Sequence, residues 1–420
     1  MCIQFPWFKT NWHDVNKLFT DWPFKEENIQ TRRKYLDKIF KSISNIPSKL
    51  SLLSDKFMTS AGPLDFMILA VIKAPYSFLN RQKCTQSNNP GSVSLTKRKI
   101  FIIESLCFFD LMMPYRYATM LDNDQYILCV ANYFEYCWNK ARVNPQWFNK
   151  IVIIERRVLD KTIGTPDWSQ SKKKLSGLNI NTGIGIEDFR DSFQVNFADP
   201  IPGGTLPSSH GDIVQEEILF LIYPELFIVP LLVFRIGQKE SIIVRGITRT
   251  NNYSGYRNSF KYRGGFTTDD KDIGIIFMDA VPGGNLNKDL NKAFLGFSCE
   301  TNNLPIATGH WGCGAFGGDK ILKSIIQLIA GAEANRNLNY AMFDDPCRGF
   351  KEFYDKMILI RATVGEIYLG LVYATDNGKA LINRSAVDNG EALINRSAVD
   401  NKLDNYYKAV TNYILALRKN

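Results

Sequence analysis

The sequence has few of the residues that build metal sites and disulfide frameworks. It holds three histidines, far apart at positions 13, 210 and 310, and eight cysteines with no Cys-x-x-Cys pair among them. Structural zinc sites and secreted disulfide scaffolds require such residues at short, regular spacings. We therefore expect no metal ion and no disulfide framework, and we expect most thiols to be reduced and buried.

The chain also lacks a segment typical of secretion or of a membrane span. Its first residues, MCIQFPWFKTNWHD, contain no positively charged start that leads into an apolar run. The most apolar stretch, residues 218–234, is long enough to cross a bilayer, but Pro224, Glu225 and Pro230 interrupt it. We interpret this stretch as a short buried helix followed by a buried strand. The expected location is the cytoplasm, the nucleus or both, without a membrane partner.

The composition is that of a folded globular protein. Of the 420 residues, 45% are hydrophobic and 22% are charged, and this length suggests two or three structural units. Lysine and arginine number 51 against 42 aspartates and glutamates, so the net charge is +9. A basic surface favours an anionic partner: nucleic acid, a membrane, or a substrate that carries phosphate. The charge alone does not choose among these three.

The spacing of apolar residues along the chain changes near residue 151. Before this point, stretches such as 65–74 and 125–138 have helical spacing, and the polar, turn-rich residues 76–98 are interpreted as a surface loop. After it, short apolar runs alternate with turns and helical stretches. We predict a helical accessory subdomain over residues 1–150. Over residues 151–420 we predict an α/β domain, a mixed sheet flanked by helices.

A tandem repeat lies close to the C-terminus. GKALINRSAVDN, residues 378–389, is followed at once by GEALINRSAVDN, residues 390–401. Two copies are too few for a solenoid, so we interpret the repeat as a duplication in a surface loop. The last residues, DNYYKAVTNYILALRKN, have the spacing of an amphipathic helix.

A glycine-rich loop occurs in ATGHWGCGAFGGD, and an apolar helical pattern follows it. Its glycines allow tight turns that expose successive N–H groups, and Asp319 can cap the helix. Such a loop can bind phosphate. The pattern also fits the Gly-x-Gly-x-x-Gly dinucleotide fingerprint, but the preceding NLPIAT is a poor strand and too little chain follows for a doubly wound domain. A turn needed only for packing remains the plain alternative.

Two adjacent carboxylates, Glu216 and Glu217, precede an apolar run. Acidic residues favour the first turn of a helix because of the helix dipole, which is the plain explanation. Adjacent helical residues point about 100° apart, so the two side chains must have different tasks. The nearby segments SFQVNFADPIPGG and NNYSGYRNSFKY add glycines and aromatic rings that could cover a base or a sugar.

Three of these segments, QEEILFLIYPEL, NYSGYRNSF and ATGHWGCGAFGGD, resemble the poly(ADP-ribose) glycohydrolase family. The signature of that family is a glycine triplet followed by QEE on a macrodomain core, and the resemblance runs from about Ile151 to Phe343. It implies a macrodomain-like fold and hydrolysis of the ribose–ribose O-glycosidic bonds of ADP-ribose polymer. It also implies release of ADP-ribose in the DNA damage response. We expect no cofactor, no direct nucleic acid binding, and a monomer.

The resemblance also implies roles for single residues. Glu217 matches the general acid that protonates the leaving 2′-oxygen and then activates water, and Glu216 matches the neighbour that holds the terminal ribose. Tyr256 matches the tyrosine that covers adenine. The full set of implied substrate contacts is Ile186, Glu187, Asn196, Asp199, Gly203, Gly204, Gln215, Tyr256, Gly312, Cys313, Gly314, Ala315, Phe316 and Phe343.

The chain departs from the family pattern at three places. Asn196 and Asp199 exchange the usual aspartate and asparagine, Pro202 stands in place of the first of three glycines, and His310 stands where asparagine is usual. Both glutamates are retained, so we expect an active enzyme. The alternatives are a catalytically impaired macrodomain module that binds ADP-ribose and an NAD-dependent oxidoreductase, which rests on the glycine pattern alone.

Overall fold

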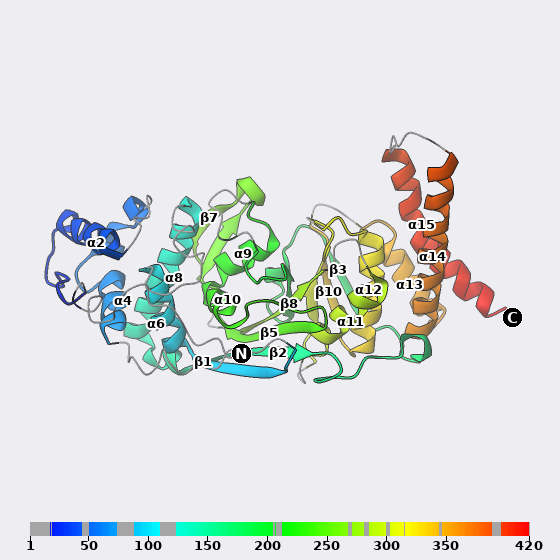
Figure 1. Ribbon diagram of the computed structural model, residues 1–420, viewed down its shortest axis with the longest axis horizontal. Helices are drawn as coiled ribbons and strands as arrows, with labels where there is room; N and C mark the ends of the chain where they lie inside the picture. The colour runs from blue at the N-terminus through cyan, green and yellow to red at the C-terminus, as the bar shows by residue number, and fades with distance from the viewer. Residues whose placement is uncertain are drawn as a thin grey trace. The chain divides into compact units, whose positions relative to one another are not determined.

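The fold is seen in a computed structural model (Figure 1). It describes residues 17, 19–43, 50–73, 88–109, 123–204, 206, 212–267, 271–280, 285–299, 303–314, 316–343, 347–388 and 396–419. For residues 42, 43, 50, 377–388 and 396–405 it describes the backbone only.

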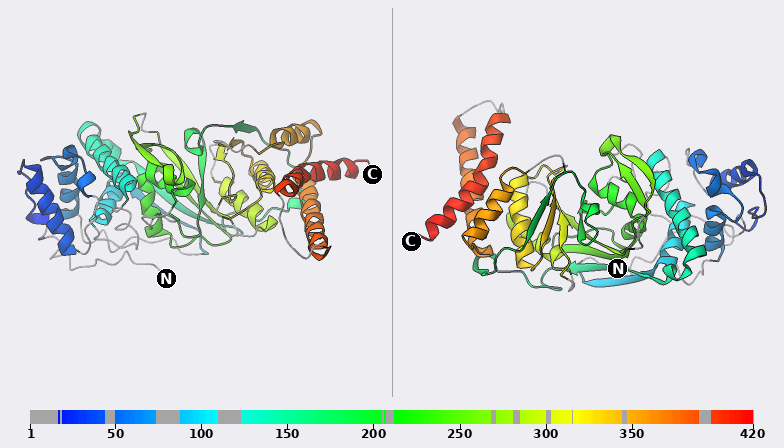
Figure 2. Two further views of the ribbon diagram at one scale, coloured as in Figure 1. Left: turned by 90° about the horizontal axis from the view of Figure 1, so that it is seen from above. Right: turned by 180° about the vertical axis from the view of Figure 1, so that it is seen from behind.

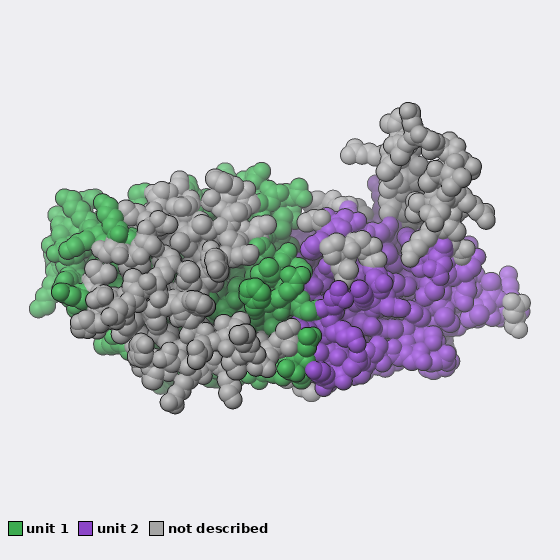
Figure 3. Space-filling model, viewed as in Figure 1, with its two compact units in different colours: residues 1–156, 198–237, 242–274 green, residues 157–197, 238–241, 275–420 purple. Residues whose placement is uncertain are grey.

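The chain divides into two compact units, coloured separately in Figure 3. The first comprises Met1–Arg156, Ala198–Gly237 and Ile242–Gly274, and the second comprises Arg157–Phe197, Gln238–Ser241 and Ile275–Asn420. These units are defined by packing, and packing units do not have to coincide with domains. The predicted domain boundary near residue 151 therefore stays a prediction.

Helices dominate the N-terminal part of the first unit, as predicted. They are α2 (Ile29–Ile43), η1 (Leu50–Leu52), α3 (Asp55–Met58), α4 (Pro63–Ile72), α6 (Lys97–Phe108), α8 (Asp124–Val143) and η2 (Pro145–Asn149). Side chains cap two of the longer helices: Thr96 accepts from the Lys99 N–H, and Asn123 accepts from the first turn of α8. A cluster of aromatic rings that includes Phe101, Phe108 and Phe134 joins α6 to α8.

The prediction of a surface loop over residues 76–98 is wrong for its last part. Strand β1 (Gly91–Thr96) pairs antiparallel with β2 (Ile151–Val158). Val93 and Leu95 are buried and alternate with serines, which is the period of two expected for a strand. Two such residues are too few to stand out within a polar segment. The remaining strands of this unit are β5 (Glu240–Ile247), next to β2, and the hairpin β6 (Asn251–Ser254) with β7 (Lys261–Gly265).

The apolar stretch 218–234 is helical and contains no strand, so the predicted buried strand is wrong. It forms the end of α9 (Gln215–Ile222), then η5 (Pro224–Ile228) and α10 (Val229–Leu232). Each proline lies in the first turn of a new helix, where a missing N–H costs nothing. The prolines therefore divide one apolar run into short helices.

The second unit contains five neighbouring strands, in the order β8-β4-β9-β10-β3. Their bounds are Leu178–Asn181 for β3, Phe193–Ala198 for β4, Ile273–Asp279 for β8, Ile306–Thr308 for β9 and Leu338–Ala341 for β10. The pairs β10 with β3, β10 with β9 and β4 with β9 are parallel. Parallel pairing here and antiparallel pairing in the first unit confirm the predicted mixed α/β fold.

The segment NLPIAT, predicted to be a poor strand, contains β9. All three residues of this strand are buried between parallel neighbours, so a very short run is enough. The helices of this unit are η3 (Trp168–Gln170), η4 (Ile186–Asp188), α11 (Leu286–Phe297), α12 (Lys320–Glu333), α13 (Phe350–Leu359), α14 (Val364–Asp388) and α15 (Arg396–Leu417). The first unit adds η6 (Arg257–Ser259).

The tandem repeat is largely helical, so its assignment to a surface loop is wrong outside residues 389–395, which lie beyond the described part. The first copy completes α14 and the second runs into α15. The repeat has one glycine per copy and no proline, so it can continue a helix. The two helices pack against each other along the chain's C-terminal region (Figure 2), and α15 confirms the predicted C-terminal helix.

Two expectations from composition can be compared with the described residues. Five described cysteines are buried and unbridged, and Cys313 is partly exposed, as predicted, while Cys2 and Cys84 lie outside the described part. Among the helices described, none has the length and apolar character needed to cross a membrane.

Candidate active site

The paired carboxylates lie at the start of α9 in the first unit. Glu216 and Glu217 are only 3% and 2% exposed, although they are charged residues in the first turn. Glu216 accepts two backbone hydrogen bonds, from the Asp199 N–H at 2.8 Å and from the Gly203 N–H at 2.9 Å. Glu217 accepts from the N–H of Val214, the N-cap residue, through Oε2 at 3.2 Å. The two side chains therefore point to different partners, as the helical geometry predicts.

The two glycines before α9 wrap the backbone around these carboxylates. Gly203 and Gly204 have φ of +97° and +51°, the left-handed region that favours glycine. A Cβ on Gly204 would lie 2.6 Å from Glu217 Oε1 and 2.9 Å from Glu216 Oε2. Pro202 fits beside them because its ring requires a negative φ. The departure from three glycines thus leaves both positions that require glycine intact.

Burial changes the acidity of Glu216. Its pKa lies well above the usual range, first because the carboxyl is desolvated and second because the charge of Glu217 is close. The hydrogen bonds from Asp199 and Gly203 act in the opposite direction but are outweighed. A pair of buried carboxyls that can hold a proton is suited to acid–base chemistry.

Asp199, predicted as a ribose contact, shapes the loop that leads to the glycines. Its Oδ1 accepts from the Ile201 N–H at 2.8 Å, while its own N–H donates to Glu216. Such an Asx turn positions the following residues. The backbone N–H of Asp199 therefore holds Glu216 directly, and its side chain holds the loop that carries Gly203.

Aromatic side chains from two other elements lie near Glu217. Tyr256 is 48% exposed, and its loop is tied to the residues before α9 by a 2.8 Å hydrogen bond from the Arg257 N–H to the Ile213 carbonyl. Partial burial raises the pKa of Tyr256, and the charge of Glu217 contributes. Tyr126 on α8 is buried, and its pKa is also raised by burial and by Glu217. Its hydroxyl has no hydrogen-bond partner among the described residues.

A buried amide network fixes the other end of α9. The Asn251 amide donates to the Leu221 carbonyl at 2.6 Å and to the Cys129 carbonyl at 3.0 Å. Asn132 in turn donates to Asn251 Oδ1 at 2.7 Å. These bonds join α9 to α8 and β6, so they hold the helix that carries both glutamates.

The glycine loop of the second unit runs from β9 to α12, and Asp319 caps the helix as predicted by accepting from the Leu322 N–H at 2.9 Å. Its turns are closed by hydrogen bonds from the N–H groups of Cys313, Gly317 and Gly318 to loop carbonyls. A Cβ at Gly314 would meet nothing within 4 Å. Ala315 lies outside the described residues, and the phosphate contacts of residues 312–316 stay a prediction.

An apolar cluster in the same unit brings two predicted residues together. Ile186 at the start of η4 packs with Ala307 and Ala341, and Phe343 and Phe197 pack against this group. Phe343 has a φ of +50°, an unusual value for an aromatic residue. Strained backbone of this kind is concentrated at functional sites.

The other predicted residues of this unit are buried or close to the loop. Glu187 is 4% exposed, and its carboxylate folds back over Gly185. Asn196 is fully buried on β4. The pKa of His310 is lowered to about 4 by burial and by the charge of Lys320, so its imidazole is neutral at pH 7.

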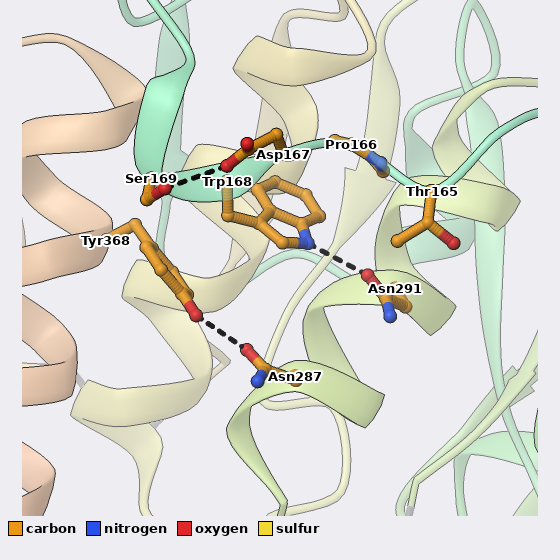
Figure 4. Close-up of a pocket in the computed structure, with 8 residues that line it drawn as sticks. All are labelled: Thr165, Pro166, Asp167, Trp168, Ser169, Asn287, Asn291 and Tyr368. Atoms are coloured by element: carbon orange, nitrogen blue, oxygen red, sulfur yellow. Dashed lines mark hydrogen bonds between the residues drawn. The ribbon is translucent and has the colours of Figure 1, made fainter.

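A separate cavity of about 270 Å³ lies elsewhere in the second unit, and the sequence did not predict it (Figure 4). Trp168 donates its indole N–H to Asn291 at 2.8 Å, and the Tyr368 hydroxyl donates to Asn287 at 3.0 Å. None of the predicted site residues lines this cavity. The lining residues are Thr165, Pro166, Asp167, Trp168, Ser169, Asn287, Asn291 and Tyr368.

Three residues next to the predicted groups were missed by sequence reasoning. Tyr126 lies in residues 125–138, whose helical spacing predicted a helix but no role for this side chain. Asn251 and Lys323 act through buried partners far away in sequence, and no local pattern indicates such partners.

Comparison with known proteins places these features in a class. Residues 165–348 match a family described as "Poly (ADP-ribose) glycohydrolase (PARG), Macro domain fold". The match includes the glutamate pair and the glycine loop. The chain therefore contains a region of the macro domain class.

Similar proteins narrow the class further. The chain is 27% identical over 403 residues to "Poly(ADP-ribose) glycohydrolase 1" of Caenorhabditis elegans, covering 87% of this chain and 49% of that protein. It is 29% identical over 327 residues to "Probable poly(ADP-ribose) glycohydrolase 2" of Arabidopsis thaliana, covering 62% of this chain and 60% of that protein. The chain is similar to members of the poly(ADP-ribose) glycohydrolase family. It spans about half to three-fifths of the length of these relatives.

A solved structure of poly(ADP-ribose) glycohydrolase from Deinococcus radiodurans in complex with ADP-ribose is also similar. The match has 12% identity and a TM-score of 0.27 and covers 46% of this chain and 87% of that one. A likeness this low supports no conclusion about the site.

Proposed function

We propose that this protein hydrolyses the ribose–ribose O-glycosidic bonds of ADP-ribose polymer and releases ADP-ribose without a cofactor. The observation that carries the proposal is the buried pair Glu216 and Glu217 at the start of α9, enclosed by Gly203 and Gly204. Two ordinary first-turn glutamates would be exposed to solvent. The names of the relatives support the same activity.

The proposed mechanism gives the two carboxyls different tasks. Glu217 donates a proton to the leaving 2′-oxygen as the bond to the anomeric carbon breaks, and positive charge develops on the ribose. Glu217 then takes a proton from the water that attacks the anomeric carbon, which restores the acid. Glu216, fixed by the Asp199 and Gly203 N–H groups, holds the ribose hydroxyls.

The remaining contacts are proposed residue by residue from the family resemblance. Tyr256 is half exposed and is proposed to stack on adenine. Phe343, which packs against the fully buried Ile186, is proposed to lie near the terminal ribose. The diphosphate is proposed to bind the backbone of residues 312–316 ahead of α12. Glu187, Asn196, Asp199 and Gln215 complete the proposed set.

The proposed partner is ADP-ribose polymer on modified proteins, and the net charge of +9 favours that polyanion. We further propose a monomer in the cytoplasm or nucleus that binds neither nucleic acid nor membranes directly. Size-exclusion chromatography with light scattering tests the monomer, and microscopy of the tagged protein tests its location.

The decisive experiment is Glu217→Gln with labelled polymer. Glutamine keeps the size of the side chain and an acceptor oxygen for the Val214 N–H but cannot transfer a proton. We expect ADP-ribose release to fall by about 10² or more, while ADP-ribose affinity measured by calorimetry changes little. Release at the wild-type rate would remove Glu217 from the mechanism.

The same assay separates the alternative, a module that binds ADP-ribose without turnover. Wild-type protein that binds ADP-ribose but releases none from polymer would support this second function. Thermal unfolding of both proteins is the control, since a misfolded variant would lose activity for an unrelated reason.

A further inference from the structure

The strongest unassigned feature is a buried cation directly beneath the glycine loop. Lys323 lies on α12, and its side chain is 3% exposed. Its Nζ is 2.7 Å from Asp289 Oδ2 on α11 and 4.3 Å from the centroid of the Trp311 ring. A lysine is almost never buried unless a partner compensates its charge, and here both an anion and an aromatic face do so.

This side chain touches both ends of the loop. A Cβ at Gly312 would lie 3.4 Å from Lys323 Cε and Nζ, and a Cβ at Gly318 would lie 3.2 Å from Cε. The same two glycines are joined by a 2.9 Å hydrogen bond from the Gly318 N–H to the Gly312 carbonyl. The backbone therefore rests on the lysine stem at the point where the loop closes.

The neighbours of Lys323 are themselves fixed. The Trp311 indole N–H donates to the Met278 carbonyl at 2.9 Å, so the ring cannot rotate away without losing a buried bond. Asp289 is 1% exposed and sits on α11, which packs against α12. The ammonium is thus held in one place by three elements, and its charge is poorly screened.

We infer that Lys323 is a positioning residue for anion binding by the glycine loop. Its stem supports the closed form of the loop that precedes the N-terminus of α12, where a phosphate is favoured. This inference rests on the proposed function only for the identity of the anion, a diphosphate.

The chain offers a matched control. Lys292 on α11 is also buried and forms an ion pair with Asp279, with Nζ 2.6 Å from Oδ1, and donates to the Glu240 carbonyl. It does not contact the loop glycines in the described structure. Lys323→Met and Lys292→Met therefore remove the same charge from two buried pairs, one beneath the loop and one away from it.

Removing a single partner leaves an uncompensated carboxylate and destabilises the fold. The double variants Lys323→Met with Asp289→Asn, and Lys292→Met with Asp279→Asn, remove both charges. They are the versions to compare if a single variant unfolds.

The experiment has two readouts. Titration with ADP-ribose should give at least tenfold weaker binding for the Lys323 variants than for the Lys292 variants, and turnover of polymer at saturation should change less than KM. Hydrogen exchange of peptides that contain residues 312–318 should be faster in the Lys323 variants only.

Equal losses of affinity and equal exchange in both sets of variants would overturn the inference, because Lys323 would then be an ordinary buried pair. Wild-type protein that does not bind ADP-ribose would instead refute the proposed function. In that case the exchange measurement and a titration with inorganic pyrophosphate still decide the role of Lys323.

Discussion

Gly204→Ala tests whether the loop before α9 is shaped by the carboxylates it encloses. The added Cβ would stand 2.6 Å from Glu217 Oε1 and 2.9 Å from Glu216 Oε2, closer than ordinary contacts between such atoms. It would also occupy a φ of +51°, which side chains other than glycine rarely adopt. The added methyl group therefore has two destabilising effects: close contact with the carboxylates and an unfavourable backbone conformation.

The size of the effect follows from these two costs. Left-handed backbone costs about 1–2 kcal/mol for a residue with a Cβ. Displacing the Glu216 carboxylate weakens its 2.8 Å hydrogen bond from the Asp199 N–H, and an unsatisfied buried group costs about 1–3 kcal/mol. We expect unfolding by urea to show a loss of about 2–5 kcal/mol. Release of ADP-ribose should fall by about 10², because a shift of about 1 Å in a catalytic group has that scale.

Gly264→Ala is the matched control. Gly264 lies on β7 in the same unit with a φ of +89°, and a Cβ there would meet nothing within 4 Å. It should lose only the backbone cost, about 1–2 kcal/mol, and keep its activity. If Gly204→Ala matches this control in both stability and activity, the carboxylates do not determine the form of the loop.

Three other predictions follow from the described contacts. Because the pKa of Glu216 is raised above 4.5, its stabilising contribution is complete below that pH and is lost as pH rises through the folded value. Glu216→Gln should therefore flatten the fall in stability that urea titrations show as the pH rises above 4.5. An unchanged slope would contradict this. Gly314→Val should fold normally, since a Cβ there meets open space, but should weaken ADP-ribose binding by a few kcal/mol; unchanged affinity by calorimetry would argue against the phosphate loop. Asn251→Leu should cost about 2–4 kcal/mol, because it leaves the Leu221 and Cys129 carbonyls without their buried donor, and normal stability by urea unfolding would exclude this role.

Sequence patterns predicted the helices and strands whose own residues strongly favour that secondary structure. The helix at residues 124–143 has an Asn cap and a buried face, and the strand at residues 151–158 is a dense run of β-branched residues. The errors are elements decided by their neighbours. Residues 91–96 become a strand because β2 pairs with them, and residues 306–308 do so because parallel strands lie on both sides.

The same distinction applies to the site. Glu216, Glu217 and the glycines could be identified because they are close together along the chain. Asn251 and Lys323 could not, since the hydrogen-bond acceptors of Asn251 and the ion-pair partner of Lys323 are about 30 or more residues away and only burial makes those contacts strong. The raised pKa of Glu216 also depends on desolvation, which no sequence pattern reports.

The capping bond of α9 gives the two carboxyl oxygens of Glu217 different surroundings. Oε2 already receives the N–H of Val214, and an oxygen that accepts a hydrogen bond is better left without a proton of its own. In the proposed mechanism the transferred proton is therefore assigned to Oε1, the oxygen that faces Gly204. One oxygen of the Glu217 carboxyl group thus caps the helix, and the other is the proposed site of proton transfer. A side chain at residue 204 would crowd this oxygen, because its Cβ would lie 2.6 Å away.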